Sequence, residues 1–152
     1  MSVEEVLKHA NEKLCEGNDA NMFVTAWMGF LNTKTGVVTY ANAGHNPPLI
    51  KHEDGTFTYL KSRAGFVLAG MEGMRYRKNE VQLMPGDTIF LYTDGVTEAT
   101  NADNELYGEE RLLHVMNLNT KVSSGELCEA VKEDVDTFVG DAPQFDDITM
   151  LC

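Results

Sequence analysis

The apolar run from Met22 to Leu31 (MFVTAWMGFL) limits the possible folds of this chain more than any other segment. Its aromatic and β-branched residues favour a strand, and its almost wholly apolar composition predicts a central strand buried on both faces. A turn at Asn32–Gly36 and a second strand at 37–43 (VVTYANA) follow directly. The two strands therefore predict an antiparallel hairpin.

The rest of the chain repeats short strands joined by tight turns, with a few helices. Ser2 with Glu5 and Ser123 with Glu126 are capping boxes, each predicting the start of a helix. The other predicted elements are strands at 49–52, 57–60, 80–84, 88–92 and 148–151 and a helix at 108–118. Hairpin-connected strands with separate helices predict an α+β fold with antiparallel sheet, because a Rossmann fold would alternate strands and helices.

Length and composition bound the function. The 152 residues suggest one domain, spanning 1–152, and 43% hydrophobic residues suffice for its core. With 24 acidic and 12 basic residues the formal charge is −12, which argues against nucleic acid as a partner. No window approaches the roughly 20 apolar residues that span a bilayer. Three widely spaced cysteines (Cys15, Cys128 and Cys152) predict neither a disulfide framework nor a zinc site and indicate a cytoplasmic protein.

Two acidic motifs are candidates for chemistry. Asp94 follows a predicted buried strand and precedes Gly95, which would let the backbone turn sharply away from a rigidly held carboxylate. Asp146 and Asp147 are adjacent carboxylates beside the last predicted strand, and such pairs suit hard cations such as Mg²⁺ and Mn²⁺. Taken singly, an ordinary Asp-Gly turn and an exposed acidic loop remain open alternatives.

A third candidate is the loop that contains His45 and Asn46 between Gly44 and two prolines. Such a rigid loop could form a pocket wall. A histidine with a satisfied structural hydrogen bond is the open alternative.

In combination and in this order, the motifs resemble one family. They are the segment 22–50, the segment LMPGDTIFLYTDGVTEA at 83–99, LYGEERL at 106–112 and FDDITML at 145–151. The sequence resembles the SpoIIE-type branch of the metal-dependent (PPM) protein serine/threonine phosphatases. The resemblance implies a β-sandwich of two antiparallel sheets flanked by helices, with a binuclear Mn²⁺ or Mg²⁺ centre. It also implies direct hydrolysis of phosphoserine or phosphothreonine, without a phosphoenzyme.

The resemblance carries over to individual residues. Asp94 matches the metal-ligand aspartate of the family's D-G motif, and Asp146 matches that of its D-[DN]-x-T motif, with Asp147 as a weaker candidate. Gly95 matches the glycine beside the metal. His45 lies in the family's A-G-H motif near the pocket, with Asn46 next to it, and neither receives a role.

The same resemblance implies an upstream strand with a further metal-ligand aspartate and a D-x-S-G-x-G-like motif, and this sequence contains neither. The chain is therefore expected to be the C-terminal part of a phosphatase domain, incomplete at its N-terminus, with a partial metal site and little activity alone.

The expected substrate is a phosphorylated anti-anti-sigma (STAS-type) protein in sigma-factor partner switching. A non-catalytic module that docks a regulatory partner is the alternative. Because missing strands would expose sheet edges, a homodimer is also expected.

Overall fold

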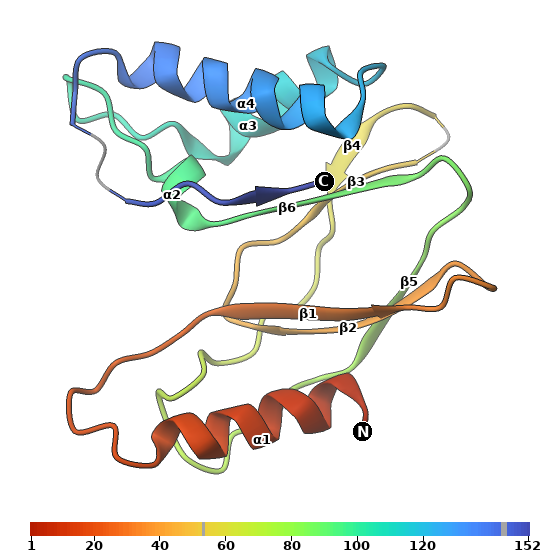
Figure 1. The fold of residues 1–152 in the computed structure, drawn as a ribbon, viewed down its shortest axis with the longest axis vertical. Helices are drawn as coiled ribbons and strands as arrows, with labels where there is room; N and C mark the ends of the chain where they lie inside the picture. The colour runs from red at the N-terminus through yellow and green to blue at the C-terminus, as the bar shows by residue number, and fades with distance from the viewer. Residues whose placement is uncertain (53, 144–145) are drawn as a thin grey trace. The chain divides into compact units, whose positions relative to one another are not determined.

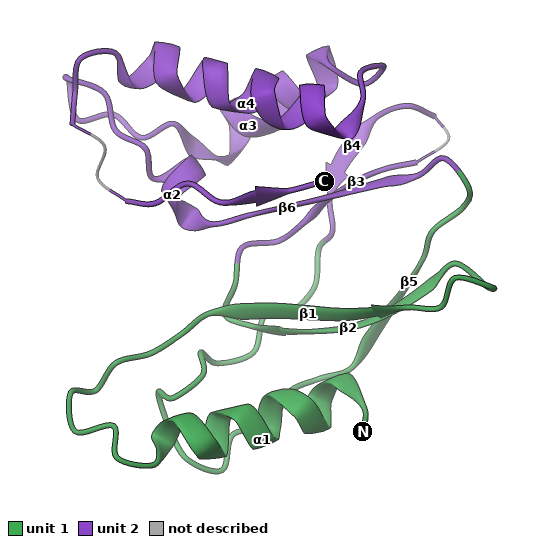
Figure 2. Ribbon diagram, in the orientation of Figure 1, with its two compact units in different colours: residues 1–45, 61–85 green, residues 46–60, 86–152 purple. Residues whose placement is uncertain are grey.

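The computed structural model describes residues 1–52, 54–143 and 146–152. The chain forms two compact units, coloured separately in Figure 2. Unit 1 contains Met1–His45 and Lys61–Pro85, and unit 2 contains Asn46–Leu60 and Gly86–Cys152. Each unit has its own antiparallel sheet and its own helical cover, so the α+β fold class predicted from the sequence is confirmed.

Unit 1 places one helix against a three-stranded sheet. The helix is α1 (Val3–Cys15), and the sheet has the order β1 (Ala26–Leu31), β2 (Val37–Ala43) and β5 (Asn79–Gln82) (Figure 1). The predicted capping box begins α1, since the Ser2 N–H donates to Glu5 Oε2 at 2.7 Å. Val3 and Leu7 of the helix pack with Ala41 and Ala43 of β2 in the core of this unit.

The prediction of a central, doubly buried strand over Met22–Leu31 is wrong. The strand begins only at Ala26 and lies at the edge of its sheet, with β2 as its neighbour. The core under α1 takes in Ala26 and Met28, whereas Phe30 and Leu31 remain 46% and 54% exposed. An apolar composition predicted the strand, but it does not determine where in a sheet the strand lies.

The exposed β1 edge leads us to expect self-association. An edge strand presents unpaired N–H and C=O groups, and apolar side chains beside them favour pairing with another chain. At high micromolar concentration, static light scattering should therefore give a mass above that of the monomer. Phe30→Lys should lower this mass, whereas Leu118→Lys, at an exposed apolar residue on α3 in the other unit, should not. A monomeric wild-type chain would contradict this expectation.

Unit 2 contains a four-stranded sheet with the order β4 (Phe57–Tyr59), β3 (Leu49–Lys51), β6 (Thr88–Tyr92) and β7 (Met150–Leu151). Its helices are α2 (Asp94–Thr97), α3 (Gly108–Leu118) and α4 (Ser124–Val139). The last two lie on one side of the sheet (Figure 1). Their buried faces pack with Phe90 of β6 through the side chains Leu112, Met116, Val131 and Val135. The predicted Ser123–Glu126 capping box begins α4.

The remaining predicted elements are present, although the strand predicted at 80–84 lies at Asn79–Gln82, the last strand covers only Met150–Leu151 of the predicted 148–151, and α2 was not predicted. Both predicted hairpins, β1–β2 and β3–β4, are antiparallel pairs. Within the described ranges, no helix is both long and apolar enough to cross a membrane.

Candidate metal centre

Asp94 lies where β6 ends and the four-residue helix α2 begins. Thr93 is the residue before this helix, in an extended conformation, and its carbonyl accepts a hydrogen bond from Val96 N–H at 3.0 Å. The carbonyl of Asp94 accepts from Glu98 N–H at 2.7 Å, so the backbone around the carboxylate is held on both sides. The Asp94 side chain itself is exposed to solvent.

The structure brings the two acidic motifs together, although they are far apart in the sequence. Thr93 N–H donates to Thr149 O at 3.0 Å, and Thr149 N–H donates to Thr93 Oγ1 at 3.1 Å. The same Thr93 hydroxyl donates to Asp147 O at 3.2 Å. These bonds continue the pairing of β6 with β7 and align the segment 146–149 along the turn that carries Asp94.

Gly95 is required for this alignment for a different reason from the one predicted. Its φ is not among the positive values of the chain, so the expected sharp turn does not need a glycine. A Cβ at this position would instead lie 2.3 Å from Asp147 O, and no side-chain movement could relieve a clash with backbone. The missing side chain allows the second acidic motif to approach the first.

The three predicted carboxylates are suited to a hard cation but are few. Asp94, Asp146 and Asp147 are all exposed, and Asp146 Oδ1 accepts from the N–H of Asp147 at 2.7 Å. Carboxylate oxygens on a backbone held by hydrogen bonds fit Mg²⁺ or Mn²⁺, which take oxygen ligands. Within residues 1–52, 54–143 and 146–152, however, no group of three or more His, Cys, Asp or Glu side chains is placed to hold a metal ion. The residues present therefore fit part of a metal site.

Two acidic residues that the sequence analysis did not single out line a small cavity with Asp146. They are Glu98, at the end of α2, and Asp136, on α4, and Gly95 and Val135 also line the cavity. Asp136 also forms an ion pair with Lys132 one turn earlier. Glu98 lies four residues after Asp94, a helical spacing that could have indicated it. Nothing in the sequence places Asp136 near this cavity.

The predicted loop residues His45 and Asn46 fall in different units. His45 is held inside unit 1, where its Nδ1 lies 2.9 Å from Thr25 Oγ1 and its N–H donates to Asn42 Oδ1 at 2.8 Å. Asn46 belongs to unit 2 and lies near the hydroxyl of Tyr92, the last residue of β6. The histidine thus has structural hydrogen bonds, as the alternative reading allowed.

Tyr92 connects the core of unit 2 to the candidate centre. Burial raises the pKa of Tyr92 to about 12, so this hydroxyl stays protonated at neutral pH. Its oxygen is buried without a hydrogen bond in good geometry to any residue that the structure describes, although Tyr59 and Asn46 lie near enough to affect its pKa. A neutral, buried side chain therefore precedes the turn that carries Asp94.

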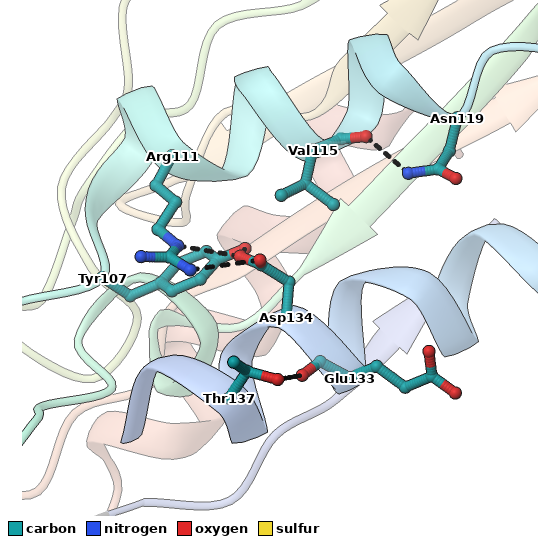
Figure 3. Close-up of polar contacts among 7 residues, drawn as sticks. All are labelled: Tyr107, Arg111, Val115, Asn119, Glu133, Asp134 and Thr137. Atoms are coloured by element: carbon teal, nitrogen blue, oxygen red, sulfur yellow. Dashed lines mark hydrogen bonds and ion pairs between the residues drawn. The ribbon is translucent and has the colours of Figure 1, made fainter. Parts of the chain in front are cut away.

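A cluster on α3 and α4 holds together the helices that cover this sheet (Figure 3). Arg111 binds Asp134 through Nε at 2.8 Å and Nη2 at 3.1 Å, and the Tyr107 hydroxyl donates to the same carboxylate at 2.8 Å. The guanidinium also lies over the rings of Tyr107 and Phe138, 5.3 and 4.8 Å from their centroids. Because α4 supplies Val135 and Asp136 to the cavity, this cluster positions one of its walls.

Comparisons with known proteins agree with this architecture. The family described as Stage II sporulation protein E (SpoIIE) matches residues 1–152. Protein IcfG of Synechocystis sp. (strain ATCC 27184 / PCC 6803 / Kazusa) is 32% identical over 136 residues, which are 90% of this chain and 21% of that protein. Phosphoserine phosphatase RsbU of Bacillus subtilis (strain 168) is 37% identical over 95 residues, 62% of this chain and 28% of that protein. The chain thus matches between a fifth and a third of the length of these relatives.

Solved structures show the same fold. The SiaA-PP2C domain of Pseudomonas aeruginosa superposes with a TM-score of 0.84 at 22% identity, covering 98% of this chain and 59% of that one. The phosphatase domain of the cell fate determinant SpoIIE from Bacillus subtilis gives a TM-score of 0.63 at 15% identity, covering 99% and 65%. The family match over the whole chain and this shared fold lead to one conclusion: the chain belongs to the SpoIIE family.

Proposed function

We propose that this chain supplies part of the active site of a metal-dependent protein serine/threonine phosphatase of the PPM type. The observation that carries the proposal is the hydrogen bonding of Thr93 to the segment 147–149, which aligns the Asp94 and Asp146 motifs on adjacent backbone segments. Membership of the SpoIIE family and the name of the Bacillus subtilis relative support it. On this proposal, residues 1–152 are part of a single phosphatase domain.

In this role Asp94 and Asp146 would hold divalent cations, with Asp147 as a weaker candidate. Bound Mn²⁺ or Mg²⁺ supplies charge neutralisation at a phosphoryl group and lowers the pKa of water. The chain's own contribution is positional. Thr93 and Gly95 keep the two acidic segments in contact, and Glu98 adds negative charge beside Asp146.

The proposed substrate is a phosphoserine on a regulatory protein of the STAS type, acted on in the cytoplasm. The name of the phosphoserine phosphatase relative supports the residue type. The absence of a CxxC pair and the odd number of cysteines support the compartment.

A non-catalytic docking module is the second candidate. The small number of metal ligands favours it, because the described residues offer no group of three or more side chains that could hold a metal ion. The two candidates differ in what they require of Asp94, since only the phosphatase proposal needs its carboxylate to bind a cation.

The proposal can be tested by measuring Mn²⁺ binding, which removes the electron paramagnetic resonance signal of the free ion. We expect Asp94→Asn to weaken binding about tenfold or more, because an amide cannot replace an anionic oxygen ligand. Asp103→Asn removes an equal charge from an exposed loop of the same unit and should leave binding unchanged. Equal affinities for the two variants would favour the docking module.

The same preparation should hydrolyse p-nitrophenyl phosphate with Mn²⁺ slowly or not at all. Two cations about 3.5–4 Å apart need more ligands than the described residues bring together. Robust turnover that Asp94→Asn abolishes would show that the centre is complete and would contradict this expectation.

A further inference from the structure

The charge of the chain is unevenly distributed. The segment 61–78 (KSRAGFVLAGMEGMRYRK) contains five of the 12 Lys and Arg residues but only one of the 24 acidic residues, Glu72. Its net charge is therefore +4, while the rest of the chain carries −16. All five basic side chains are exposed, and they are Lys61, Arg63, Arg75, Arg77 and Lys78.

Most of these cations form no ion pair with the residues that the structure describes. Lys78 pairs with Glu80 at 3.5 Å. The other four form no ion pair within 4 Å with any residue that the structure describes, although acidic side chains are abundant. An isolated solvated lysine would be ordinary, but four cations without an ion pair to any described residue concentrate positive charge in one segment of an acidic protein.

The segment is held firmly in unit 1 and passes beside α1 (Figure 1). Its backbone is bonded to three other parts of the unit. Gly65 N–H donates to Asn42 O at 2.8 Å, and the backbones of Leu68 and Val24 form a pair of hydrogen bonds at 2.8 and 3.0 Å. The side-chain amide of the fully buried Asn11 accepts from Ala69 N–H and donates to Met71 O, each at 2.9 Å. The charged side chains therefore extend from an ordered backbone, which reduces the entropy that binding would cost.

Two arginines flank a buried residue. Tyr76 is only 7% exposed, and its hydroxyl donates to Val67 O at 3.4 Å. Arg75 and Arg77, on either side of it, are exposed. The two guanidinium groups therefore extend into solvent on either side of an anchored residue. Guanidinium groups form bidentate hydrogen bonds with carboxylates.

Apolar side chains accompany the charges. Phe66 is 45% exposed and Met71 58% exposed. The Phe66 ring packs closely over Gly70, since a Cβ there would lie 2.6 Å from Phe66 Cε1. Exposed arginine, aromatic and methionine side chains together are the residue types enriched in protein–protein interfaces.

We propose that the segment 61–78 is a docking surface for an acidic face of a partner protein. Its charge complements a compact cluster of carboxylates, and Phe66 and Met71 supply apolar contact. A DNA duplex carries negative charge along its whole length, and the rest of the chain, with a net charge of −16, repels it. A membrane surface would likewise bring many anionic headgroups near the rest of the chain. The proposal does not depend on the phosphatase activity of unit 2.

Fluorescence anisotropy with a labelled octapeptide of alternating glutamate and tyrosine tests the proposal. We expect saturable binding that weakens with added salt, because the charges are exposed. Arg75→Glu with Arg77→Glu should weaken binding at least tenfold. Lys34→Glu with Lys121→Glu changes the net charge equally at exposed residues outside the segment and should weaken it less than twofold. Phe66→Ser should weaken it about threefold, an effect that charge alone would not produce.

Each other outcome overturns the proposal. It fails if the peptide does not bind, or if the two double variants weaken binding equally, since the attraction would then be a property of the net charge. It fails too if a short DNA duplex or phosphatidylserine vesicles bind more tightly than the peptide and lose binding in the Arg75/Arg77 variant. The milder pair Arg75→Gln and Arg77→Gln, with circular dichroism as a check of folding, separates lost binding from lost structure.

Discussion

Replacing Gly95 with alanine should destabilise unit 2 by about 3 kcal/mol. The added Cβ would lie 2.3 Å from the carbonyl oxygen of Asp147 and 2.9 Å from its carbonyl carbon. Overpacking against backbone costs about 1–3 kcal/mol, or more where nothing can yield. The strain should also separate the segment 147–149 from Thr93. Urea denaturation followed by far-UV circular dichroism measures the change in stability.

Gly125→Ala is the matched control. Gly125 also lies in a helix, in the first turn of α4, and a Cβ there would contact nothing within 4 Å. Alanine should stabilise this position by about 0.4–1 kcal/mol, because it restricts the unfolded chain more than glycine does. Equal effects at the two positions would show that the close approach to Asp147 does not constrain the fold.

Replacing Arg111 with alanine should cost about 1–3 kcal/mol. The change removes two hydrogen bonds to Asp134 and the contacts of the guanidinium with the Tyr107 and Phe138 rings. The stacking contacts contribute about 0.5–1 kcal/mol each at exposed sites. The pair itself is partly exposed and contributes modestly, so much of the loss is packing. Urea denaturation again gives the magnitude.

A double-mutant cycle with Asp134→Asn separates the pair from the packing. If Arg111 acts through Asp134, the double variant should be less destabilised than the sum of the single variants. Strict additivity would contradict the role of this pair in joining α3 to α4.

The same pair predicts a dependence on pH. Hydrogen bonds from Arg111 lower the pKa of Asp134, with a smaller contribution from Tyr107, while partial burial acts in the opposite direction. A carboxylate whose pKa is lower in the folded state stabilises the fold fully above the unfolded value, 3.8, and loses this contribution as the pH falls through the folded value. The stability difference between wild type and Asp134→Asn should therefore be constant near neutral pH and shrink below about pH 4.

Local structure could largely be predicted from the sequence. The capping boxes at Ser2 and Ser123 begin helices where predicted, because the residues that form them are neighbours in the chain. The hairpin turn at Asn32–Gly36 and the strand Val37–Ala43 are likewise where the pattern placed them. The sequence motifs also indicated the family to which the chain belongs.

The arrangement of the candidate site could not be predicted from the sequence, because it depends on contacts between segments that are far apart in the chain. Gly95 was expected to make a turn, and its role became visible only when the Asp147 carbonyl was found beside it. Asp136 lies on a helix whose sequence gives no sign of the cavity that it shares with Asp146. The exposure of Phe30 and Leu31 was missed because an apolar strand has the same composition at the centre and at the edge of a sheet.

The sequence by itself determined most of the secondary structure, the antiparallel class and the family. Those properties depend on composition and on residues close together in the chain. Only the tertiary structure decided which strand lies at an edge, why Gly95 must lack a side chain and that the Thr93 and Thr149 backbones are joined. These features arise from steric and hydrogen-bonding contacts between segments far apart in the chain, and such contacts exist only after the chain has folded.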